Sequence, residues 1–596
     1  MKIWHGLLLI VIVAAVGMIA CSNGPEPFVE PDPVLDETSL RTVAQGDLVG
    51  YTHFENEVHV WRSVPYAAPP IGDLRWRAPR PAASWTDTRE SLDPAPWCVQ
   101  VKGQLDDSNP DLEGVEVGSA VGQEDCLYIN IYAPKMGAED AANAKLPVMM
   151  WIHGGSNVWG RAAQYDPSDF VENEQVIVAV MQYRLGPLGW FAHPTIREAA
   201  ETADDGSANF AILDQIAALD WLGANVAAFG GDPNNITIFG ESAGGHDVAT
   251  LLGSPRAAGT FHRAIIQSGS FRSETLEDAE NKTNQASKPI VSELFPNAET
   301  VSADDLRGVP VNVLFGAYMS DARDGLEPPR IIEDGIVVPL GGLREAFNST
   351  DTFNAVPIMS GTNKDEVKFF NVFVDELVKW RFGALPKARD LDEYNAVNDA
   401  QSRMWRYGAV DQPFEAMIAA GHTDLYGYRF DWDEEGSVWG SNFADLFGAA
   451  HSFEIPFVFG QFRFLGSADR WVFTKKNEAD RIGLSKRMQA YWGEFAYSGD
   501  PANGSSDDEA EWSAWTLDAN TPNIMIFDTD GDGTTRMIAD LESGERIRND
   551  LFADTRLPNL EYKCRLHLAT QYWDPAHEPT AGGRCSSDAA SALAAE

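Results

Sequence analysis

Four short, predominantly apolar runs constrain the fold of this chain more than any other feature. They are Val148–Ile152, Val176–Met181, Ile236–Phe239 and Ala264–Ile266. Strands buried on both faces of a parallel sheet have this pattern, whereas strands with one exposed face alternate apolar and polar residues. We therefore expect the four runs to be strands of one parallel sheet.

A helical pattern separates the second run from the third. Apolar residues recur there at three- and four-residue spacings and form one stripe: Ile212, Ile216, Leu219, Leu222 and Val226. Gly and Pro in Phe229–Pro233 end the pattern. The run Tyr426–Phe430 predicts a later strand. Alternating strands and helices predict an α/β fold, with a large, mostly parallel central sheet flanked by helices and with helical insertions over the sheet edge near 275–335 and 370–420.

The charge of the chain is strongly acidic. The formal net charge is −44, from 89 acidic and 45 basic residues. Such a surface repels nucleic acid and anionic lipid, so we expect no nucleic-acid partner. The hydrophobic content of 44 % is that of an ordinary globular protein.

The first residues predict export. Lys2 precedes the uncharged apolar stretch Leu7–Ala20, which is shorter than the roughly 20 residues of a spanning helix. The stretch ends at Met18–Cys21, which resembles a bacterial lipobox. Residues 1–20 are thus expected to be a lipoprotein signal peptide, with Cys21 lipidated at the cell envelope, and Ser22 favours the outer membrane. The alternative is a plain secretory signal that yields a periplasmic or secreted protein. In the lipoprotein case, the protein is expected to contact the membrane only through this lipid.

Cysteines and composition set the expected boundaries. Apart from Cys21, four cysteines remain, an even number in an oxidising compartment: Cys98, Cys126, Cys564 and Cys585. Three pairings are open, and the local pairing, Cys98 with Cys126 and Cys564 with Cys585, closes the shortest loops. Residues 21–41 are rich in proline and acidic residues, which predicts a tether. We expect residues 42–568 to form the catalytic domain and residues 569–596 to form a C-terminal tail.

The string Gly240-Glu241-Ser242-Ala243-Gly244 stands between an expected strand and an expected helix. In that context it predicts a nucleophile elbow, with Ser242 on a strained turn that requires small flanking residues. The helix N-terminus directs free N–H groups at the reacting centre. Glu241 either adds a negative field near the base or locks the elbow.

The glycine-rich segment His153–Ser156 follows the first apolar run. It predicts an oxyanion hole built around Gly154, with the N–H groups of Gly155, Ser156 and Ala243 as donors. Trp159 is a candidate wall of the pocket. A phosphate-binding loop is disfavoured because no Lys-Ser or Lys-Thr pair follows.

The catalytic base and acid are expected after the nucleophile, in the order serine, acid, histidine. Four histidines lie well downstream of the elbow: His422, His451, His567 and His577. His451 is favoured because it follows the last expected strand closely, and His246 lies too near Ser242. Asp365 and Glu366 both follow a short strand, and spacing alone does not separate them.

The chain resembles the type-B carboxylesterases, an α/β-hydrolase family that includes acetylcholinesterase and the liver carboxylesterases. The resemblance covers roughly 42–568. It begins at Val64–Pro79, continues through Gln123–Pro134 and is densest over Ala208–Gly245. It implies a serine carboxylic-ester hydrolase that works through an acyl-enzyme without a cofactor or metal. It also implies that Glu366 is the acid, that His451 is the base and that Cys98 pairs with Cys126.

Three departures from the family pattern bear on the substrate. Ser156 replaces a third glycine, which leaves a backbone donor in place. Asn157 replaces a common phenylalanine and is expected to reshape the acyl pocket. No tryptophan stands in Glu113–Gln123, which disfavours a quaternary-ammonium ester. The alternatives are a hydrolase of a bulky ester, such as a polyester, toxin or plant phenolic ester, and a non-catalytic surface adhesion protein.

One acidic segment begins like a calcium loop. Asp528, Asp530 and Asp532 have the required spacing, but Ala539 stands where an EF-hand needs Glu. Apolar residues flank the segment on both sides. The pattern therefore favours a β-hairpin turn over a calcium site.

Overall fold

The computed structural model describes residues 30–103, 112, 114–320, 323, 325–327, 329–381, 385–504, 509–531, 533–573 and 580–585. The predicted signal peptide, Cys21 and Asp532 lie outside this range. In the part of the chain so described, no helix has the length and apolar character needed to cross a membrane.

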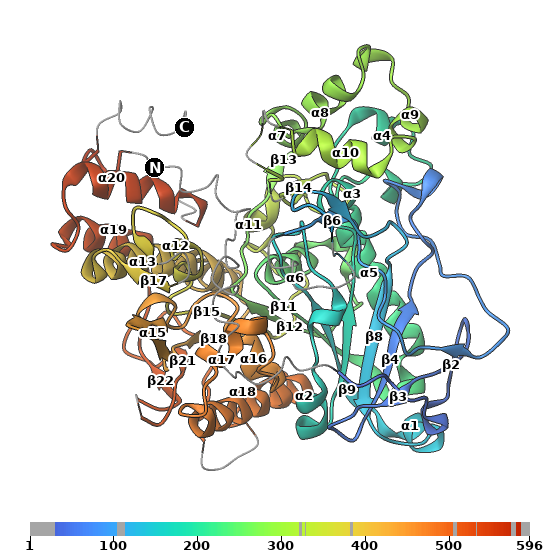
Figure 1. The fold of residues 1–596 in the computed structure, drawn as a ribbon, viewed down its shortest axis with the longest axis horizontal. Coiled ribbons are helices and arrows are strands. Elements are labelled where there is room, and N and C mark those ends of the chain that lie inside the picture. The colour runs from blue at the N-terminus through green and yellow to red at the C-terminus, as the bar shows by residue number, and fades with distance from the viewer. Residues whose placement is uncertain are drawn as a thin grey trace.

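An eleven-stranded sheet forms the centre of the molecule (Figure 1). In spatial order its strands are β22 (Arg536–Ile538), β21 (Ile524–Phe527), β18 (Leu425–Phe430), β15 (Ile358–Asn363), β12 (Arg263–Gln267), β11 (Gly231–Glu241), β9 (Leu146–Ile152), β10 (Ile177–Met181), β8 (Tyr128–Pro134), β4 (Val58–Pro65) and β3 (Tyr51–Thr52). The strands from β21 to β10 pair in parallel, and antiparallel strands border them on both sides.

The four apolar runs lie in β9, β10, β11 and β12, as predicted, and Tyr426–Phe430 lies in β18. Side chains of β9 alternate between two cores: Val148, Met150 and Ile152 face one, and Met149 and Trp151 face the other. Both faces of the strand are therefore buried, which explains the unbroken apolar sequence.

Helices cover both faces of the sheet. One core contains residues of α5 (Phe210–Asn225) and α6 (Ala243–Gly253), and the other contains residues of α2 (Ser168–Glu174), α16 (Ile455–Phe459) and α18 (Glu478–Ser498). The predicted helical stripe is α5, and a left-handed Gly230 closes the short turn that follows it. The chain thus has the layered architecture that the sequence predicted.

Two groups of helices stand apart in Figure 1, one at the top of the view and the other at its left-hand side. One holds α7 (Leu276–Asn281), α8 (Ser287–Leu294), α9 (Ala303–Arg307) and α10 (Val311–Tyr318). The other holds α13 (Leu391–Arg406), α19 (Gly544–Ala553) and α20 (Leu560–Ala569), with α14 (Gln412–Ala419) further along the chain. These groups contain the insertions predicted near 275–335 and 370–420.

The packed part of the chain begins earlier than the predicted boundary at residue 42. Leu35 forms a β-bridge with Tyr51, and Ser39 is fully buried and accepts from Trp61 Nε1 through its carbonyl at 2.9 Å. The last third of the predicted tether is therefore part of the domain. A proline- and acid-rich composition did not reveal these few contacts.

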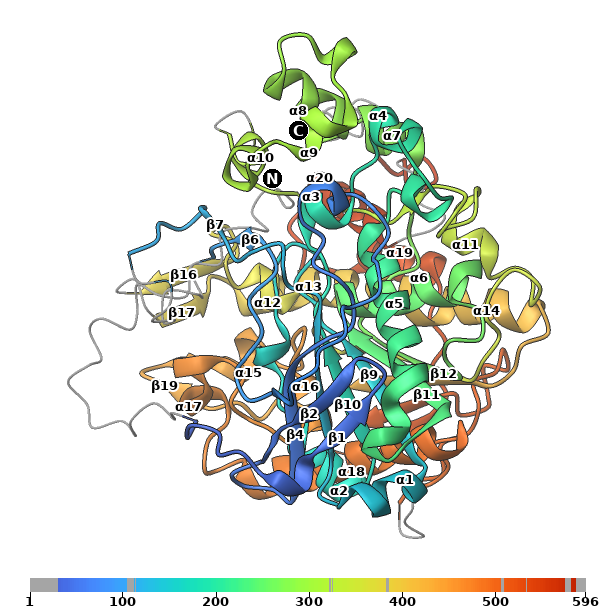
Figure 2. The same cartoon turned by 90° about the vertical axis from the view of Figure 1, so that its right-hand side faces the viewer.

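The packed part also continues past residue 568. Thr570 and Trp573 are buried, and Cys585 is joined to Cys564. The second disulfide joins Cys98 to Cys126, so the structure has the local pairing that the sequence favoured. In Figure 2, which is seen from the right-hand side of Figure 1, α19 and α20 lie towards the back of the molecule, behind α5 and α3 respectively.

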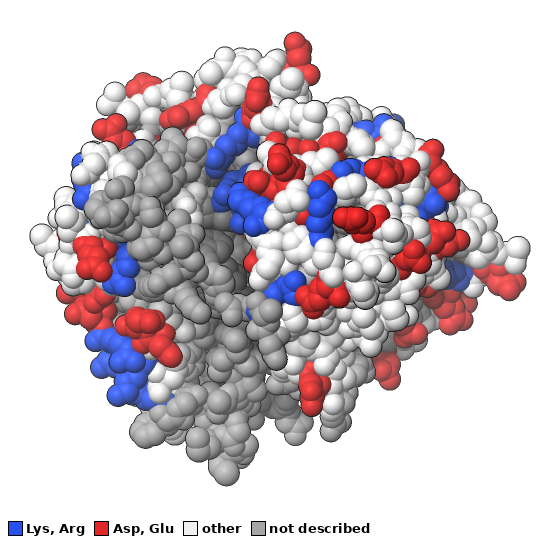
Figure 3. Space-filling model, turned by 90° about the horizontal axis from the view of Figure 1, so that it is seen from above, with Lys and Arg blue, Asp and Glu red and all other residues white. Residues whose placement is uncertain are grey.

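Acidic side chains are spread over the face seen in Figure 3, with Lys and Arg placed between them. The strong negative charge of the chain is thus distributed over a solvated surface rather than gathered in one patch of that face.

Candidate active site

Ser242 stands between the last residue of β11 and the first residue of α6. Its backbone has φ 58° and ψ −121°, a conformation that residues with side chains rarely adopt. The Ser242 amide donates to the carbonyl of Gln267, on the neighbouring strand β12, at 2.9 Å. The side chain is partly exposed. This is the sharp strand-to-helix turn that the sequence predicted.

Glycines allow the segments of the site to approach one another. A Cβ at Gly240 would lie 2.7 Å from the carbonyl oxygen of Gly244, and a Cβ at Gly244 would overlap the carbonyl oxygen of Ile152. A Cβ at Gly154 would lie 3.1 Å from that of Ser242. The elbow and the glycine-rich loop therefore touch through positions that have no room for a side chain.

Glu366 and His451 form a buried pair. His451 Nδ1 lies 2.6 Å from Glu366 Oε2, and both side chains are almost completely inaccessible to solvent. The second oxygen of Glu366 accepts from the backbone amide of Asn363, the last residue of β15, at 2.8 Å. These two contacts fix the carboxylate and orient the imidazole.

Asp365 is held elsewhere. Its Oδ1 lies 3.0 Å from Lys368 Nζ, and the side chain is half-buried. Of the two acids that the spacing left open, the structure thus brings Glu366, and not Asp365, to His451.

Glu241 lies on the opposite side of the imidazole. His451 Nε2 is 3.2 Å from Glu241 Oε1, which also accepts from Ser452 Oγ at 2.7 Å. Within the described residues, no hydrogen bond joins Ser242 Oγ to His451. Catalytic hydrogen bonds are often long in substrate-free enzymes, and here the imidazole bridges two carboxyl groups instead.

A third carboxyl group lies close by. Glu454 is fully buried, and it accepts from Asn363 Nδ2 at 2.6 Å and from Gln267 Nε2 at 3.3 Å. The sequence analysis assigned this residue no role.

The three carboxyl groups and His451 form one buried cluster, in which the pKa values of His451, Glu241 and Glu454 are shifted. Burial lowers the pKa of His451, but the negative charges of Glu241 and Glu366 together raise it by more than burial lowers it, so that it reaches about 9. Burial raises the pKa of Glu241 to about 7, against the attraction of His451 and a hydrogen bond from Ser452. Burial, then Glu241 and Glu366, raise the pKa of Glu454 to about 8. The cluster therefore retains protons at neutral pH.

The predicted oxyanion loop has an unusual backbone. Gly155, Ser156 and Asn157 have φ values of 99°, 55° and 60° in succession. Gly155 and Ser156 are partly exposed beside the elbow. The side chain of Asn157, in contrast, is buried and donates to Asp247 Oδ1 at 3.1 Å. The Asn157 amide is thus directed into the protein, and the expectation that its replacement of phenylalanine reshapes the acyl pocket stays a prediction.

The other histidine candidates have different surroundings. His246 Nε2 lies 2.6 Å from the carbonyl oxygen of Arg272, and burial lowers its pKa to about 4. His422 packs on Phe353, with ring centroids 5.7 Å apart. His567 is buried in α20. His577 lies outside the described residues.

The acidic segment after β21 is a hairpin, as predicted. Ile524 pairs with Ile538 in an antiparallel register. Asp530 binds Arg487 Nη2 at 2.8 Å and accepts from Thr534 Oγ1 at 2.9 Å. Over the described residues, no three His, Cys, Asp or Glu side chains are grouped as metal ligands.

Aromatic side chains surround His451. The ring centroids of Trp405, Phe370 and Phe369 lie 4.8, 5.4 and 6.3 Å from that of the imidazole. Trp405 Nε1 donates to the carbonyl of Gly269 at 3.0 Å, which fixes its orientation. Phe369 and Phe370 follow Glu366 closely in sequence, so their place beside the site could have been predicted. The position of Trp405 could not have been predicted in this way.

Trp573 supports Trp405 from the C-terminal part of the chain. The two rings are stacked, with centroids 5.1 Å apart. A Cβ at Gly408 would overlap the carbonyl oxygen of Trp573, so glycine is required for this approach. The segment after α20 is therefore connected to the site through one aromatic pair.

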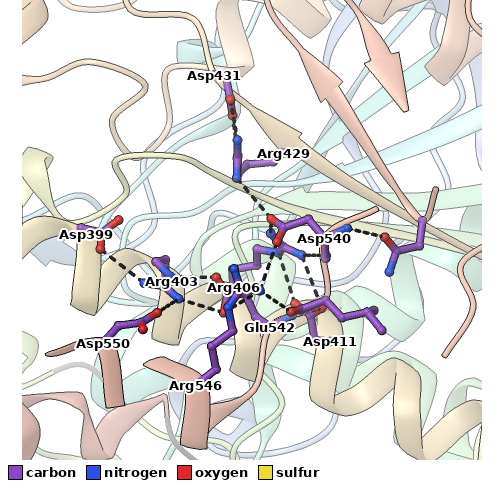
Figure 4. A network of polar contacts seen from close by, with 12 residues as sticks. Asp399, Arg403, Arg406, Asp411, Arg429, Asp431, Asp540, Glu542, Arg546 and Asp550 are labelled. Carbon is purple, nitrogen blue, oxygen red and sulfur yellow. Dashed lines mark hydrogen bonds and ion pairs between the residues drawn. The ribbon is translucent and has the colours of Figure 1, made fainter. Parts of the chain in front are cut away.

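A buried ion network fixes the turn that follows Trp405 (Figure 4). This turn, Tyr407–Asp411, is π-helical, a geometry that is frequent at functional sites. Arg406 donates to Asp540 Oδ2 at 2.6 Å, and its Nε lies 3.2 Å from Asp411 Oδ2. Other charged members include Asp399, Arg403, Arg429, Asp431, Glu542, Arg546 and Asp550.

Comparison with known proteins gives one consistent family. The model of the carboxylesterase family matches residues 37–399 and 387–542. The para-nitrobenzyl esterase of Bacillus subtilis (strain 168) is 31 % identical over 519 residues, which cover 82 % of this chain and 95 % of the relative. The fumonisin B1 esterase of Sphingopyxis macrogoltabida is 31 % identical over 529 residues, which cover 83 % and 89 %.

A solved structure gives the same result. The carboxylesterase of Geobacillus stearothermophilus at pH 6.2 has a TM-score of 0.64 and 26 % identity, and the match covers 86 % of this chain and 99 % of that one. The central sheet and its flanking helices are thus those of the α/β-hydrolase fold.

Proposed function

The chain belongs to the carboxylesterase family, whose members are hydrolases acting on carboxylic esters, and from that premise we propose that Ser242, His451 and Glu366 are its catalytic triad. The observation that carries this proposal is the combination of the strained Ser242, at φ 58°, with the buried Glu366–His451 pair at 2.6 Å. Glu241 links the two, because it precedes Ser242 and contacts His451.

The proposed reaction has two steps. His451 Nε2 takes the proton of Ser242 Oγ as that oxygen attacks the ester carbonyl, and the N–H groups of Gly155, Ser156 and Ala243 bind the oxyanion. His451 then protonates the leaving alkoxide, which releases the alcohol and leaves an acyl group on Ser242. Water attacks the acyl group, gives its proton to His451 and releases the carboxylic acid, and the proton returns to Ser242.

Glu366 would keep the imidazole in the tautomer that carries its proton on Nδ1. The charged form of His451 would then lie between Glu366 and Glu241, and both carboxylates favour that form. Because only neutral His451 can accept the serine proton, the proposed enzyme works best above neutral pH.

The aromatic surroundings of His451 favour a bulky or aromatic ester. The leaving alcohol must lie within hydrogen-bonding distance of His451 Nε2 to be protonated, so its carbon atoms lie near Trp405 and Phe370. One relative is named for fumonisin B1, which supports bulky substrates in this family. A panel of p-nitrophenyl, benzyl and ethyl esters of the same acids separates this specificity from that of a general short-chain esterase.

Covalent labelling tests the proposed nucleophile. We expect a fluorophosphonate probe to add its mass to the peptide that contains Ser242, and Ser242→Ala to lose both labelling and p-nitrophenyl acetate hydrolysis. The matched control is Ser437→Ala, at an exposed serine in a surface hairpin, which keeps both. Full turnover by a folded Ser242→Ala variant would contradict the triad and favour another mechanism.

We also propose export as a lipoprotein anchored through Cys21. The two disulfides support passage through an oxidising compartment. Metabolic labelling with an alkynyl fatty acid tests the anchor. Label is expected on the unaltered chain and not on Cys21→Ser, and an unlabelled native chain would favour a plain secretory signal.

A further inference from the structure

Asp247 is a buried carboxyl group on the helix that begins at the nucleophile. It lies in α6, five residues after Ser242, and is fully inaccessible to solvent. Oδ1 accepts from Asn157 Nδ2 at 3.1 Å, and Oδ2 accepts from Gln215 Nε2 at 2.6 Å. Both partners are neutral amides, and over the described residues no Lys, Arg or His forms an ion pair with Asp247.

A carboxyl group in such surroundings is costly, because burial disfavours its charge and no cation offsets that cost. Burial raises the pKa of Asp247 to about 7, and the hydrogen bonds from Gln215 and Asn157 oppose this only in part. The adjoining phenol of Tyr183 also has a raised pKa, first from its own burial and then from the charge of Asp247. Because burying the Asp247 carboxyl group disfavours folding, we infer that this residue has a role beyond packing.

The loop that Asp247 contacts requires external support. Ser156 and Asn157 both adopt left-handed φ values, which are unfavourable for residues other than glycine. Asn157 is held at several points. Its Oδ1 lies 3.2 Å from Tyr183 Oη, and its carbonyl accepts from the amide of Gly186 at 2.7 Å. Over the described residues, the bond to Asp247 is the hydrogen bond that joins this loop to α6.

The two sets of proposed oxyanion donors therefore sit on the two sides of this bond. Ala243 is the first residue of α6, whereas Gly155 and Ser156 belong to the loop. We propose that Asp247 is a positioning residue that acts through Asn157 and fixes the distance between these donors. This inference rests on the proposed esterase mechanism and extends it to a residue that does not touch the substrate.

Removing either partner is expected to impair the chemical step. Asn157→Ala and Asp247→Ala should each lower kcat for p-nitrophenyl acetate roughly 10- to 100-fold, less than the loss of a whole donor, with KM changed at most about 3-fold. A trifluoromethyl ketone inhibitor, which presents an oxyanion to the site, should bind more weakly by a similar factor. Asp247→Asn retains an oxygen that accepts from Asn157 and should recover most of the activity.

A double-mutant cycle separates positioning from general destabilisation. If the two residues act through one bond, the double variant should be no slower than the worse single variant. Thr250→Val is the matched control: Thr250 is buried on the same helix, and among the described residues its hydroxyl donates only to the carbonyl of His246, at 2.9 Å, so kcat should be unchanged. The thermal unfolding temperature of every variant is measured alongside its kinetics, so that a loss of stability is recognised.

Several results would overturn the inference. Variants with a lower unfolding temperature but normal kcat and inhibitor affinity would make the pair purely structural, and additive losses in kcat would separate the two residues. If Asp247→Ala does not fold, Asn157→Ala and Asp247→Asn still decide the question. Turnover by Ser242→Ala would refute the esterase mechanism itself, whereas an active native enzyme with unaffected Asp247 variants would refute this inference alone.

Discussion

His451 Nε2 lies 3.2 Å from Glu241 Oε1, on the side of the ring opposite the contact with Glu366. The imidazole is therefore placed between two carboxyl groups in a site that excludes water from all three side chains. A positive charge on His451 is favoured there, and the strength of the base depends on Glu241 as well as on Glu366.

Glu241→Gln should shift the pH dependence of hydrolysis to lower pH. The pKa of His451 is raised to about 9, so in the native chain kcat/KM should rise with pH through the alkaline range as the neutral base forms. Replacing Glu241 removes a negative charge beside the imidazolium, so the pKa of His451 should fall. The measurement is kcat/KM against pH for both chains.

Glu454→Gln is the control for this shift. Glu454 has the weakest effect on the pKa of His451 among the carboxyl groups of the cluster, so its variant should move the profile less. A Glu241→Gln profile that stays in place, or moves to higher pH, contradicts the interpretation.

Glu366→Gln should reduce kcat by roughly 10⁴-fold, because a neutral amide favours the wrong imidazole tautomer, as in serine proteases. Asp365→Asn is the neighbouring control and should remain within a few-fold of the native rate, since Asp365 is bound to Lys368. Steady-state kinetics on one p-nitrophenyl ester checks both variants. Equal losses would mean that the two acids share the role.

Trp573→Ala should change specificity rather than abolish activity. Trp573 stacks on Trp405, which contacts His451, and an aromatic pair contributes about 0.5–1.5 kcal/mol beyond the area it buries. We expect kcat/KM for aryl esters to fall roughly 2- to 10-fold relative to ethyl esters of the same acid. Trp439→Ala is the control, because Trp439 is 77 % exposed on a surface hairpin. An unchanged ratio of aryl to ethyl ester turnover in Trp573→Ala would remove this residue from the specificity of the site.

Two glycine-to-alanine variants should have opposite effects on stability. Gly244→Ala forces a Cβ into the carbonyl of Ile152, so it should lower the unfolding temperature and the activity. Gly223→Ala lies on an exposed face of α5 with no atom near its Cβ, so it should stabilise the protein by about 0.5–1 kcal/mol. Calorimetry on the two variants tests the pair, and a destabilised Gly223→Ala would show that the helix surface is under other constraints.

The sequence was most informative where one local rule determines the structure. The parallel strands were predictable because burial on both faces leaves only apolar residues, as in β9. The elbow was predictable because a strained serine between a strand and a helix requires Gly240 and Gly244. The position of the base followed from the order of the strands, since His451 comes after β18 and before β21.

Contacts between segments distant in sequence were not predictable in this way. Trp405 and Trp573 are 168 residues apart by their numbers and meet through stacking alone, a contact without a sequence pattern. Leu35 and Ser39 pack on the domain although their segment has the composition of a linker. Asp247 did leave a signal, because a charged residue interrupts the apolar helix Ala243–Gly253.

The bond between Asn157 and Asp247 also has an evolutionary consequence. A phenylalanine at 157 would leave the Asp247 carboxyl without one of its two donors, and loss of the carboxyl would leave the Asn157 amide without its acceptor. Each single replacement therefore leaves a buried polar group without a partner, and once one residue has changed, replacement of the other carries a smaller cost. Engineering that introduces an aromatic side chain at position 157 should therefore exchange both residues together.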